Sequence, residues 1–195
     1  IMRKYIIKLY KIKILKRIIP SLLKKITKLL NINEVIIESQ KFLFSLNLNN
    51  PIDREIYLKD QYELAQILFL INEIKNNKLE IFIDIGSHMG IYTLLLSEQV
   101  KYVYSFEPLK KNYNQLKRNI KINNLLNVKY FNIALSDKKK NIDLWVTDIN
   151  RSGGYSIYDK NDEELKKYKL EYISISQSTS DKGDNLLNIS KNKIA

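Results

Sequence analysis

Two acidic residues in the middle of the sequence each follow directly on a short apolar run, where a carboxylate can take part in ligand binding. Asp84 follows the run 81–83, and Glu107 follows the run 102–106. A carboxylate accepts hydrogen bonds from hydroxyl groups and pairs with cations. Glu107 lies about 20 residues after the turn that follows Asp84, the spacing at which dinucleotide-binding folds place the acid that binds ribose hydroxyls. The pair therefore suits a ligand that carries both a ribose and a positive group.

The elements around these acids predict how they are positioned. The apolar segment 81–85 is typical of a buried parallel strand. Gly86 and Gly90 predict a tight turn into a helix, Gly86 because it takes backbone angles closed to other residues and Gly90 because it lets the helix start approach strand and ligand. The alternating segment 102–106 predicts a second strand, and Pro108 fits the first turn of the next helix. This order predicts an α/β fold with a Rossmann-like sheet, whose ligand lies beyond the carboxyl ends of the strands.

The turn favours one adenosine cofactor over another. Dinucleotide enzymes usually carry GxGxxG, whose central glycine lets a pyrophosphate approach, and this glycine is missing here. Asp84 would also repel a pyrophosphate. S-adenosylmethionine has no phosphate, and it offers a ribose to Glu107 and an amino group and a sulfonium to the acidic turn. We therefore expect S-adenosylmethionine, with an NAD-dependent oxidoreductase as the alternative.

Several motifs that occur in order resemble those of the FkbM-type methyltransferases. They are Phe82–Thr93, Ser105–Pro108, Asn119–Asn123, Asn127–Val128 and Ala134–Asp137, preceded by Ile52–Ile56 and Tyr62–Glu63. The resemblance covers roughly Leu46 to the end of the chain. It implies a class I methyltransferase domain that transfers a methyl group from S-adenosylmethionine, typically to a hydroxyl of a sugar, glycan or polyketide. Ser87 and His88 stand where that family more usually has Ala and Asn.

Spacing and resemblance together give a set of candidate cofactor-binding residues and no catalytic residue. The set is Asp84, Gly86, Ser87, Gly90, Glu107 and Asn132. Asn132 falls at the end of a predicted third strand, 128–133, and two interpretations stay open: its side chain contacts the adenine, or it caps the loop. We expect His88 to be tolerated in the turn rather than to act in catalysis. A single histidine and the absence of cysteine exclude His-based and thiolate metal clusters.

Other segments predict helices and strands around this core. Asp60 and Glu63 form a capping box for a helix that ends at 76–77, and the resemblance adds that Glu63 approaches the cofactor. An added hairpin is expected because the connection between its strands is too short for a crossover helix. The strands of this hairpin and the later elements are predicted at 142–146, 155–158, 172–175 and, as a short helix, 184–189.

Composition divides the chain into a basic head and a nearly neutral remainder. The 195 residues carry a net charge of +12 and 45% hydrophobic residues, enough for a core. Residues 1–30 contain ten Lys or Arg and no acid, which leaves 23 basic and 21 acidic residues elsewhere. We predict a basic helical N-terminal extension over residues 1–45 and the N-terminal part of a methyltransferase domain over residues 46–195. The lack of cysteine suits a reducing cytoplasm.

Residues 1–30 allow two interpretations. Ile and Leu alternate with lysines, and no uncharged run approaches the length needed to cross a bilayer. The favoured interpretation is a solubilised helix that packs on the domain and breaks near Pro20. The other is an amphipathic helix on an anionic membrane, which would make the protein peripherally membrane-associated, or even a non-catalytic membrane-associated fragment. No nucleic-acid partner is expected, because aromatic stacking positions are sparse in this segment.

The predicted strands amount to the first half of such a sheet. The resemblance implies further strands on the other side of the strand 81–85, which would otherwise have an open edge. We therefore expect the chain to be the N-terminal portion of a longer protein, with candidate catalytic residues beyond Ala195. We also expect an exposed apolar flank on its sheet.

Overall fold

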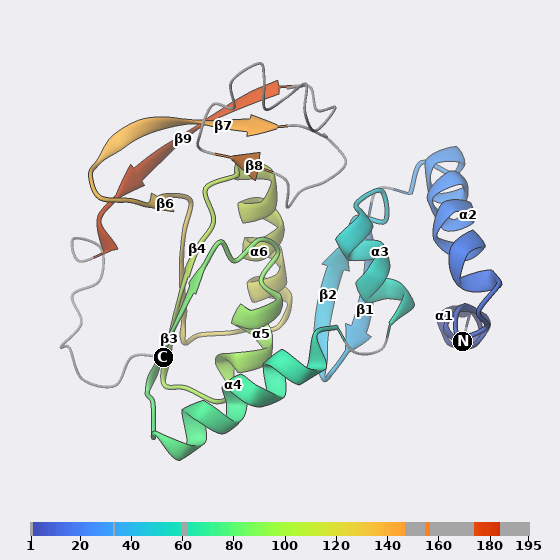
Figure 1. Cartoon of the computed structure of the whole chain (residues 1–195), viewed down its shortest axis with the longest axis horizontal. Coiled ribbons are helices and arrows are strands. Elements are labelled where there is room, and N and C mark those ends of the chain that lie inside the picture. The colour runs from blue at the N-terminus through green and yellow to red at the C-terminus, as the bar shows by residue number, and fades with distance from the viewer. Residues whose placement is uncertain (1, 33, 60–61, 147–154, 157–173, 184–195) are drawn as a thin grey trace. The chain divides into compact units, whose positions relative to one another are not determined.

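A computed structural model describes residues 2–32, 34–59, 62–146, 155–156 and 174–183 (Figure 1). The chain forms two compact units, residues 1–65 and residues 66–195. The sequence analysis placed the boundary between residues 45 and 46 instead. That boundary would cut through a hydrogen-bonded hairpin, because Ser45 and Leu46 belong to a strand that pairs with residues 35 and 36.

The N-terminal unit contains helices and one hairpin. Its elements are α1 (Met2–Tyr10), α2 (Leu15–Leu29), β1 (Val35–Ser39), β2 (Phe42–Leu46) and α3 (Pro51–Leu58). Gln40 and Lys41 have φ of 50° and 74°, which gives the two-residue turn whose twist matches an antiparallel pair. The Asn50 side chain accepts a hydrogen bond from the Ile52 backbone and so caps α3. The predicted helical extension is therefore helical only as far as residue 29.

Pro20 does not break the helix, contrary to the sequence prediction. It lies inside α2, which runs on to Leu29, and the break between α1 and α2 falls at residues 11–14. A proline in a helix removes one N–H donor, here the one facing the carbonyl of Lys16. The remaining backbone bonds of α2 carry the helix past this position.

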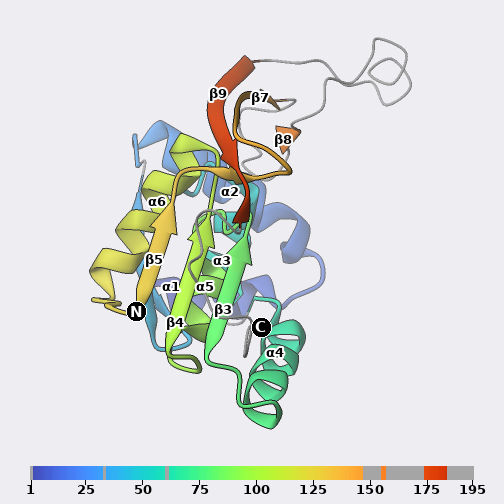
Figure 2. The same cartoon turned by 90° about the vertical axis from the view of Figure 1, so that its left-hand side faces the viewer.

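The C-terminal unit is built on a parallel sheet of three strands. Its strands are β3 (Ile81–Ile85), β4 (Tyr102–Phe106) and β5 (Val128–Phe131), in the order β3-β4-β5. The crossovers contain α5 (Ile91–Ser97) and α6 (Lys110–Ile122), which lie on one side of the sheet (Figure 1). Figure 2 shows the three strands side by side. This is the Rossmann-like α/β arrangement that the sequence predicted.

Helices α5 and α6 cover one face of the parallel sheet, and the other face is more exposed. On β3, Phe82 and Asp84 are buried, whereas Ile83 is half-buried and Ile85 is 66% exposed. Among the described strands, β3 pairs along one side only and lies at the edge of the sheet. The open edge was expected from the sequence, and Ile85 is the exposed apolar residue on this strand.

Two helices, α4 before β3 and α6 after β4, begin later in the sequence than predicted. Helix α4 (Leu64–Asn76) begins after Glu63, which has φ of 48° and so lies outside the helix. The predicted capping box is therefore wrong at Glu63, and Asp60 lies outside the described residues. Likewise, α6 begins at Lys110 with Leu109 as its N-cap, so Pro108 precedes the helix instead of occupying its first turn.

A second, mixed sheet extends the C-terminal unit. It contains β6 (Ala134–Leu135), β7 (Lys140–Val146), β8 (Tyr155–Ser156) and β9 (Ser174–Asp181), in the order β6-β9-β7-β8. The predicted hairpin is confirmed, since β7 and β8 pair antiparallel. The predicted strand 172–175 appears as β9 from residue 174, and the predicted helix 184–189 lies outside the described residues. The Ser178 hydroxyl donates to the Pro108 carbonyl at 2.9 Å, which holds this sheet beyond the carboxyl end of β4 (Figure 2).

Candidate functional site

The glycine loop, residues 86–90, joins the carboxyl end of β3 to α5. Three of its residues have left-handed backbone angles: Gly86 (φ 78°), His88 (φ 52°) and Gly90 (φ 92°). The backbone N–H groups of Gly86 and Ser87 both donate to the carbonyl of Phe106, at 2.9 and 3.0 Å. The loop is thus bonded to the end of β4, one residue before Glu107.

The two glycines of the loop have different surroundings. A Cβ added to Gly86 would meet no atom within 4 Å, so this residue borders open space. A Cβ added to Gly90 would lie 2.5 Å from the Leu116 side chain of α6. The sequence analysis expected Gly90 to bring the helix start close to a ligand. In the structure the small size of Gly90 lets α6 pack against the loop, whereas the open side of the loop lies beside Gly86.

Glu107 connects the loop to the start of α6. One carboxylate oxygen, Oε2, accepts the His88 N–H at 2.8 Å, and the other, Oε1, accepts the Leu109 N–H at 2.9 Å. The Asn112 amide lies 3.4 Å from Oε1. Burial raises the pKa of Glu107, and these hydrogen bonds partly offset the rise. A carboxylate has about four acceptor positions, so Glu107 retains capacity for a further donor.

Asp84 faces the interior between the sheet and α5, not an open site. Its Oδ2 accepts the Thr93 hydroxyl at 2.5 Å, and that hydroxyl also lies 2.7 Å from the Ser105 hydroxyl on the adjacent strand. Burial raises the pKa of Asp84. The sequence analysis expected this carboxylate to face the ligand. The register explains the difference, because Asp84 pairs with Ser105 and shares the helix-covered face of the sheet with Phe82.

The two acids nevertheless lie close enough to interact. The negative charge of Asp84 contributes to the raised pKa of Glu107, after the larger effect of burial. Of the two, Glu107 is the one whose carboxylate is bonded to the glycine loop, through the N–H of His88.

The described role of His88 in the loop comes from its backbone, through its left-handed φ angle and its N–H group. Its N–H donates to Glu107 while its φ is positive, a conformation in which Asn, Asp and His are enriched among non-glycine residues. Histidine is therefore a residue type that tolerates this angle. Burial, and then the charge of Lys111, lower the pKa of His88 to about 4. A group of that pKa is a weak general base at neutral pH.

Ser87 and Asn132 bond to the protein backbone. The buried Ser87 hydroxyl donates to the Phe106 carbonyl at 3.3 Å. The Asn132 amide donates to the carbonyls of Glu107 and Pro108, at 2.8 and 2.9 Å. Of the two interpretations of Asn132, these bonds match the loop-capping one. Both side chains fix the backbone on either side of Glu107.

Sequence reasoning did not identify the residues of α5 and α6 that support the loop. Asn119 is fully buried and its amide donates to the Met89 carbonyl at 2.9 Å. Asn112 approaches Glu107, and Thr93 bonds to Asp84. A signal was available for the two asparagines: they lie seven residues apart on the buried face of α6 that also carries Leu116. A polar residue on such a face needs a buried partner.

The fold and the loop define an α/β unit of Rossmann-like topology with a polar site at the carboxyl ends of β3 and β4. No protein-family model and no curated protein sequence matches the chain. The resemblance to the FkbM-type family therefore stays a prediction.

Solved structures give partial similarities. One is TYW2 of M. jannaschii in complex with AdoMet, with 23% identity and a TM-score of 0.36 over 51% of this chain and 42% of that one. A second is Trm5b from Pyrococcus abyssi, with 15% identity and a TM-score of 0.40 over 55% of this chain and 33% of that one. A third is a SAM-dependent methyltransferase from Agrobacterium tumefaciens, with 11% identity and a TM-score of 0.40 over 53% and 39%. The chain thus matches less than half the length of each.

Proposed function

We propose that the protein is an S-adenosylmethionine-dependent methyltransferase whose cofactor lies against the glycine loop and Glu107. One observation carries the proposal: an acceptor with spare capacity, Glu107, is bonded to a loop whose first glycine borders open space. A ribose hydroxyl donates to a carboxylate in this position in many nucleotide-binding folds. The open side of Gly86 supplies room for the ligand at the same point.

The backbone of the loop argues for this cofactor over a dinucleotide. Helix starts bind phosphates through free N–H groups. Here the N–H groups of Gly86 and Ser87 donate to Phe106, that of His88 donates to Glu107, and that of Gly90 donates to the Ser87 carbonyl at 2.7 Å. A pyrophosphate would find these four donors engaged and two carboxylates beside it. An NAD-dependent reaction therefore fits the loop poorly.

The residues present fit the proposed cofactor in charge as well as in space. Glu107 would hold the ribose, and the negative charge of Asp84 would favour the positive end of the cofactor from beneath the loop. When bound, S-adenosylmethionine supplies an electrophilic methyl group on a sulfonium. The contribution of this chain is to bind and orient it, since proximity and alignment supply a large part of the rate in transfers of this kind.

The acceptor in this proposal is a hydroxyl of a sugar, glycan or related natural product. Support for it comes from the resemblance of the motifs, together with the nearly neutral charge balance of residues 31–195, which hold 23 basic and 21 acidic residues. A balance of this kind gives a nucleic-acid backbone little net attraction.

Binding of labelled S-adenosylmethionine, measured by equilibrium dialysis, tests the proposal. We expect Glu107→Ala to weaken binding about tenfold to a hundredfold, the value of a lost hydrogen bond to a charged group. Glu98→Ala, which removes an exposed acid at the end of α5, is the matched control and should bind as the parent does. Thermal unfolding of both variants separates lost binding from lost structure.

Two results would contradict the proposal. Equal binding by the parent and by a folded Glu107→Ala variant would remove the role assigned to Glu107. Protection from unfolding by NADH but not by S-adenosylmethionine would favour the oxidoreductase instead.

A further inference from the structure

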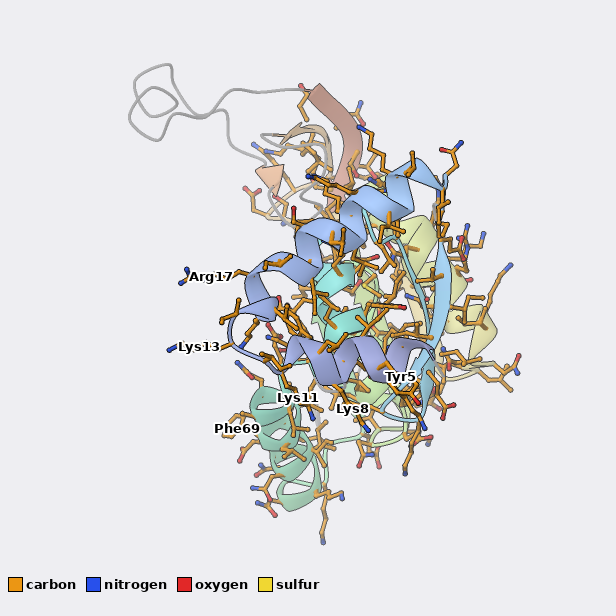
Figure 3. The ribbon with its side chains drawn as sticks, turned by 90° about the vertical axis from the view of Figure 1, so that its right-hand side faces the viewer. Tyr5, Lys8, Lys11, Lys13, Arg17 and Phe69 are labelled. Carbon is orange, nitrogen blue, oxygen red and sulfur yellow. The ribbon has the colours of Figure 1, made fainter. Side chains whose placement is uncertain are left out.

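The basic segment, residues 1–30, forms α1, a turn and α2 in the N-terminal unit. All ten of its charged residues are Lys or Arg. Figure 3 shows the side chains of Lys8 extending from α1, of Lys11 and Lys13 from the turn, and of Arg17 pointing outward near the start of α2. These cations therefore lie on the surface of one small unit.

Helix α2 exposes an apolar stripe that its own unit does not cover. The stripe is Ile18, Leu22, Ile26 and Leu29, at spacings of four, four and three residues, with 42–85% of each side chain exposed. Such spacing puts the four on one face of a helix. The packed face is a different one, with Thr27 buried and Ile19 and Leu23 half-buried. Packing inside the unit explains the apolar residues of the packed face, but it does not explain why the stripe is apolar.

Cations border the exposed stripe. Lys25 is exposed and lies three residues after Leu22 and four before Leu29, so it lies at one edge of the stripe. Arg17 and Lys28 are also exposed and lie farther round the helix on the same side as Lys25. A surface that is aliphatic along one face and positive on one side of that face is complementary to an anionic lipid bilayer, where the acyl boundary takes the apolar side chains and the headgroups take the charges.

Arg3, unlike the exposed cations of the segment, bonds to backbone carbonyls within the N-terminal unit. The Arg3 guanidinium donates to the carbonyls of Tyr57 and Glu38, at 3.0 and 3.1 Å, and also approaches that of Ile56. Arg3 thus fastens α1 to the end of α3 and to β1. Because α1 is fastened in this way, a surface that holds α2 also holds the rest of the N-terminal unit.

We propose that α2 lies flat on an anionic membrane surface, with the stripe Ile18, Leu22, Ile26 and Leu29 in the headgroup region. The proposal does not depend on the methyltransferase activity. Helix α2 has 15 residues, about 22 Å in length, and none of the described helices is long and apolar enough to cross a bilayer. A nucleic acid is a poorer match, because a phosphate backbone has no use for four exposed aliphatic side chains. The favoured sequence interpretation, a helix that only packs on its own domain, does not account for this stripe.

Co-sedimentation of the protein with vesicles of phosphatidylcholine, with and without phosphatidylserine, tests the proposal. The parent should sediment with the anionic vesicles, and less so as salt is raised, because the headgroup interactions are screened. The triple variant Ile18→Gln/Leu22→Gln/Ile26→Gln keeps every charge and should bind the anionic vesicles about tenfold more weakly or worse. The control Leu68→Gln/Phe69→Gln/Leu126→Gln removes three exposed apolar side chains outside the basic segment and should bind as the parent does.

Every other outcome counts against the proposal. Failure of the parent to bind either vesicle, equal binding to both vesicles, or unchanged binding by the stripe variant would overturn it. Self-association of the parent that the stripe variant abolishes, in the absence of vesicle binding, would assign the stripe to a second copy of the chain. Circular dichroism of the stripe variant at the parent's helix content establishes that lost binding is not lost folding.

Discussion

The glycine loop and helix α2 differ in what fixes their residues. In the loop, four backbone N–H groups have acceptors within the protein, and three residues hold left-handed angles that only a few residue types tolerate. In α2, the one side chain with described hydrogen bonds is Thr27, which bonds within its own helix to the carbonyls of Leu23 and Lys24. The loop residues are therefore explained by contacts inside the unit, whereas the apolar stripe of α2 is not.

Because of this difference, substitutions in the loop and substitutions on the stripe should have different effects on stability. A substitution in the loop must disturb the protein itself, because each residue there has a partner or a backbone angle to lose. A substitution on the stripe must leave stability nearly unchanged and alter only what the surface contacts. Stability measurements can therefore confirm or break the comparison without knowledge of any ligand.

The largest effect should come from Gly90→Ala. We expect it to lower the free energy of unfolding by about 3 kcal/mol, because crowding in a packed core costs about 1–3 kcal/mol and a left-handed angle about 1–2 kcal/mol more. The added Cβ would press on Leu116, which is fully buried and has little room to move. Urea denaturation followed by circular dichroism measures the change.

Gly86→Ala is the matched control for that variant. It carries a similar backbone angle, with φ of 78°, but its Cβ would enter open space. Only the angle then costs energy, about 1 kcal/mol. Equal losses for the two variants would mean that crowding against Leu116 plays no part, and that the two glycines do not differ as described.

Asn119→Ala should have the next largest effect, a loss of about 2 kcal/mol. The variant removes the donor to the Met89 carbonyl in a fully buried site and leaves a small cavity. The measurement is again urea denaturation. Asn123→Ala, at the end of the same helix, removes a bond to the Asn119 carbonyl from a half-buried residue and should cost less than 1 kcal/mol. A smaller loss at position 119 than at position 123 would show that the loop does not depend on α6.

The sequence predicted the elements of the site better than their contacts. Strand β3, the loop and β4 follow from apolar runs and glycines within a few residues, so local pattern was enough. The contact of Gly90 with Leu116 and the bond of Asn119 to Met89 join residues 26 and 30 positions apart. Such contacts depend on how α6 packs, which no local pattern contains.

The errors in the N-terminal half have the same origin. Glu63 has the residue type and spacing of a capping box, yet the chain reaches α4 through a left-handed angle at this residue. Proline tends to end or kink helices, yet α2 continues through Pro20. Local propensity is a weak prior that tertiary packing overrides.

The pH dependence of stability tests whether the side chain of His88 is shielded from water, as its lowered pKa implies. The pKa of His88 is lowered to about 4, so its stabilising contribution is present above the ordinary value of 6.5 and is lost as pH falls toward 4. His88→Asn keeps a residue suited to the left-handed angle and removes this titration. Between pH 7.5 and 5, the variant should therefore gain about 1 kcal/mol of stability relative to the parent, after allowance for solvent screening of the ring.

Asp84→Asn should shift the same profile in the opposite direction. The pKa of Asp84 is raised, so its stabilising contribution is full below its ordinary value and is lost as pH rises through the raised value. The parent thus gains stability from Asp84 on acidification, and the Asn variant should not. Identical pH profiles for parent, His88→Asn and Asp84→Asn would mean that water reaches the loop freely.

The smallest effect should be that of the stripe variant Ile18→Gln/Leu22→Gln/Ile26→Gln on stability. Exposed side chains contribute little to folding, and surface substitutions usually change stability by less than about 0.5 kcal/mol each. Circular dichroism during urea denaturation measures the N-terminal unit. Ile7→Ala, in the buried face of α1, is the contrasting variant and should cost about 2 kcal/mol or more. If the stripe variant cost as much as Ile7→Ala, the stripe would belong to the core of the protein. A loss near zero together with lost vesicle binding would instead leave the stripe without any role in folding, and the four exposed aliphatic residues of the stripe would then be explained by the surface that they bind.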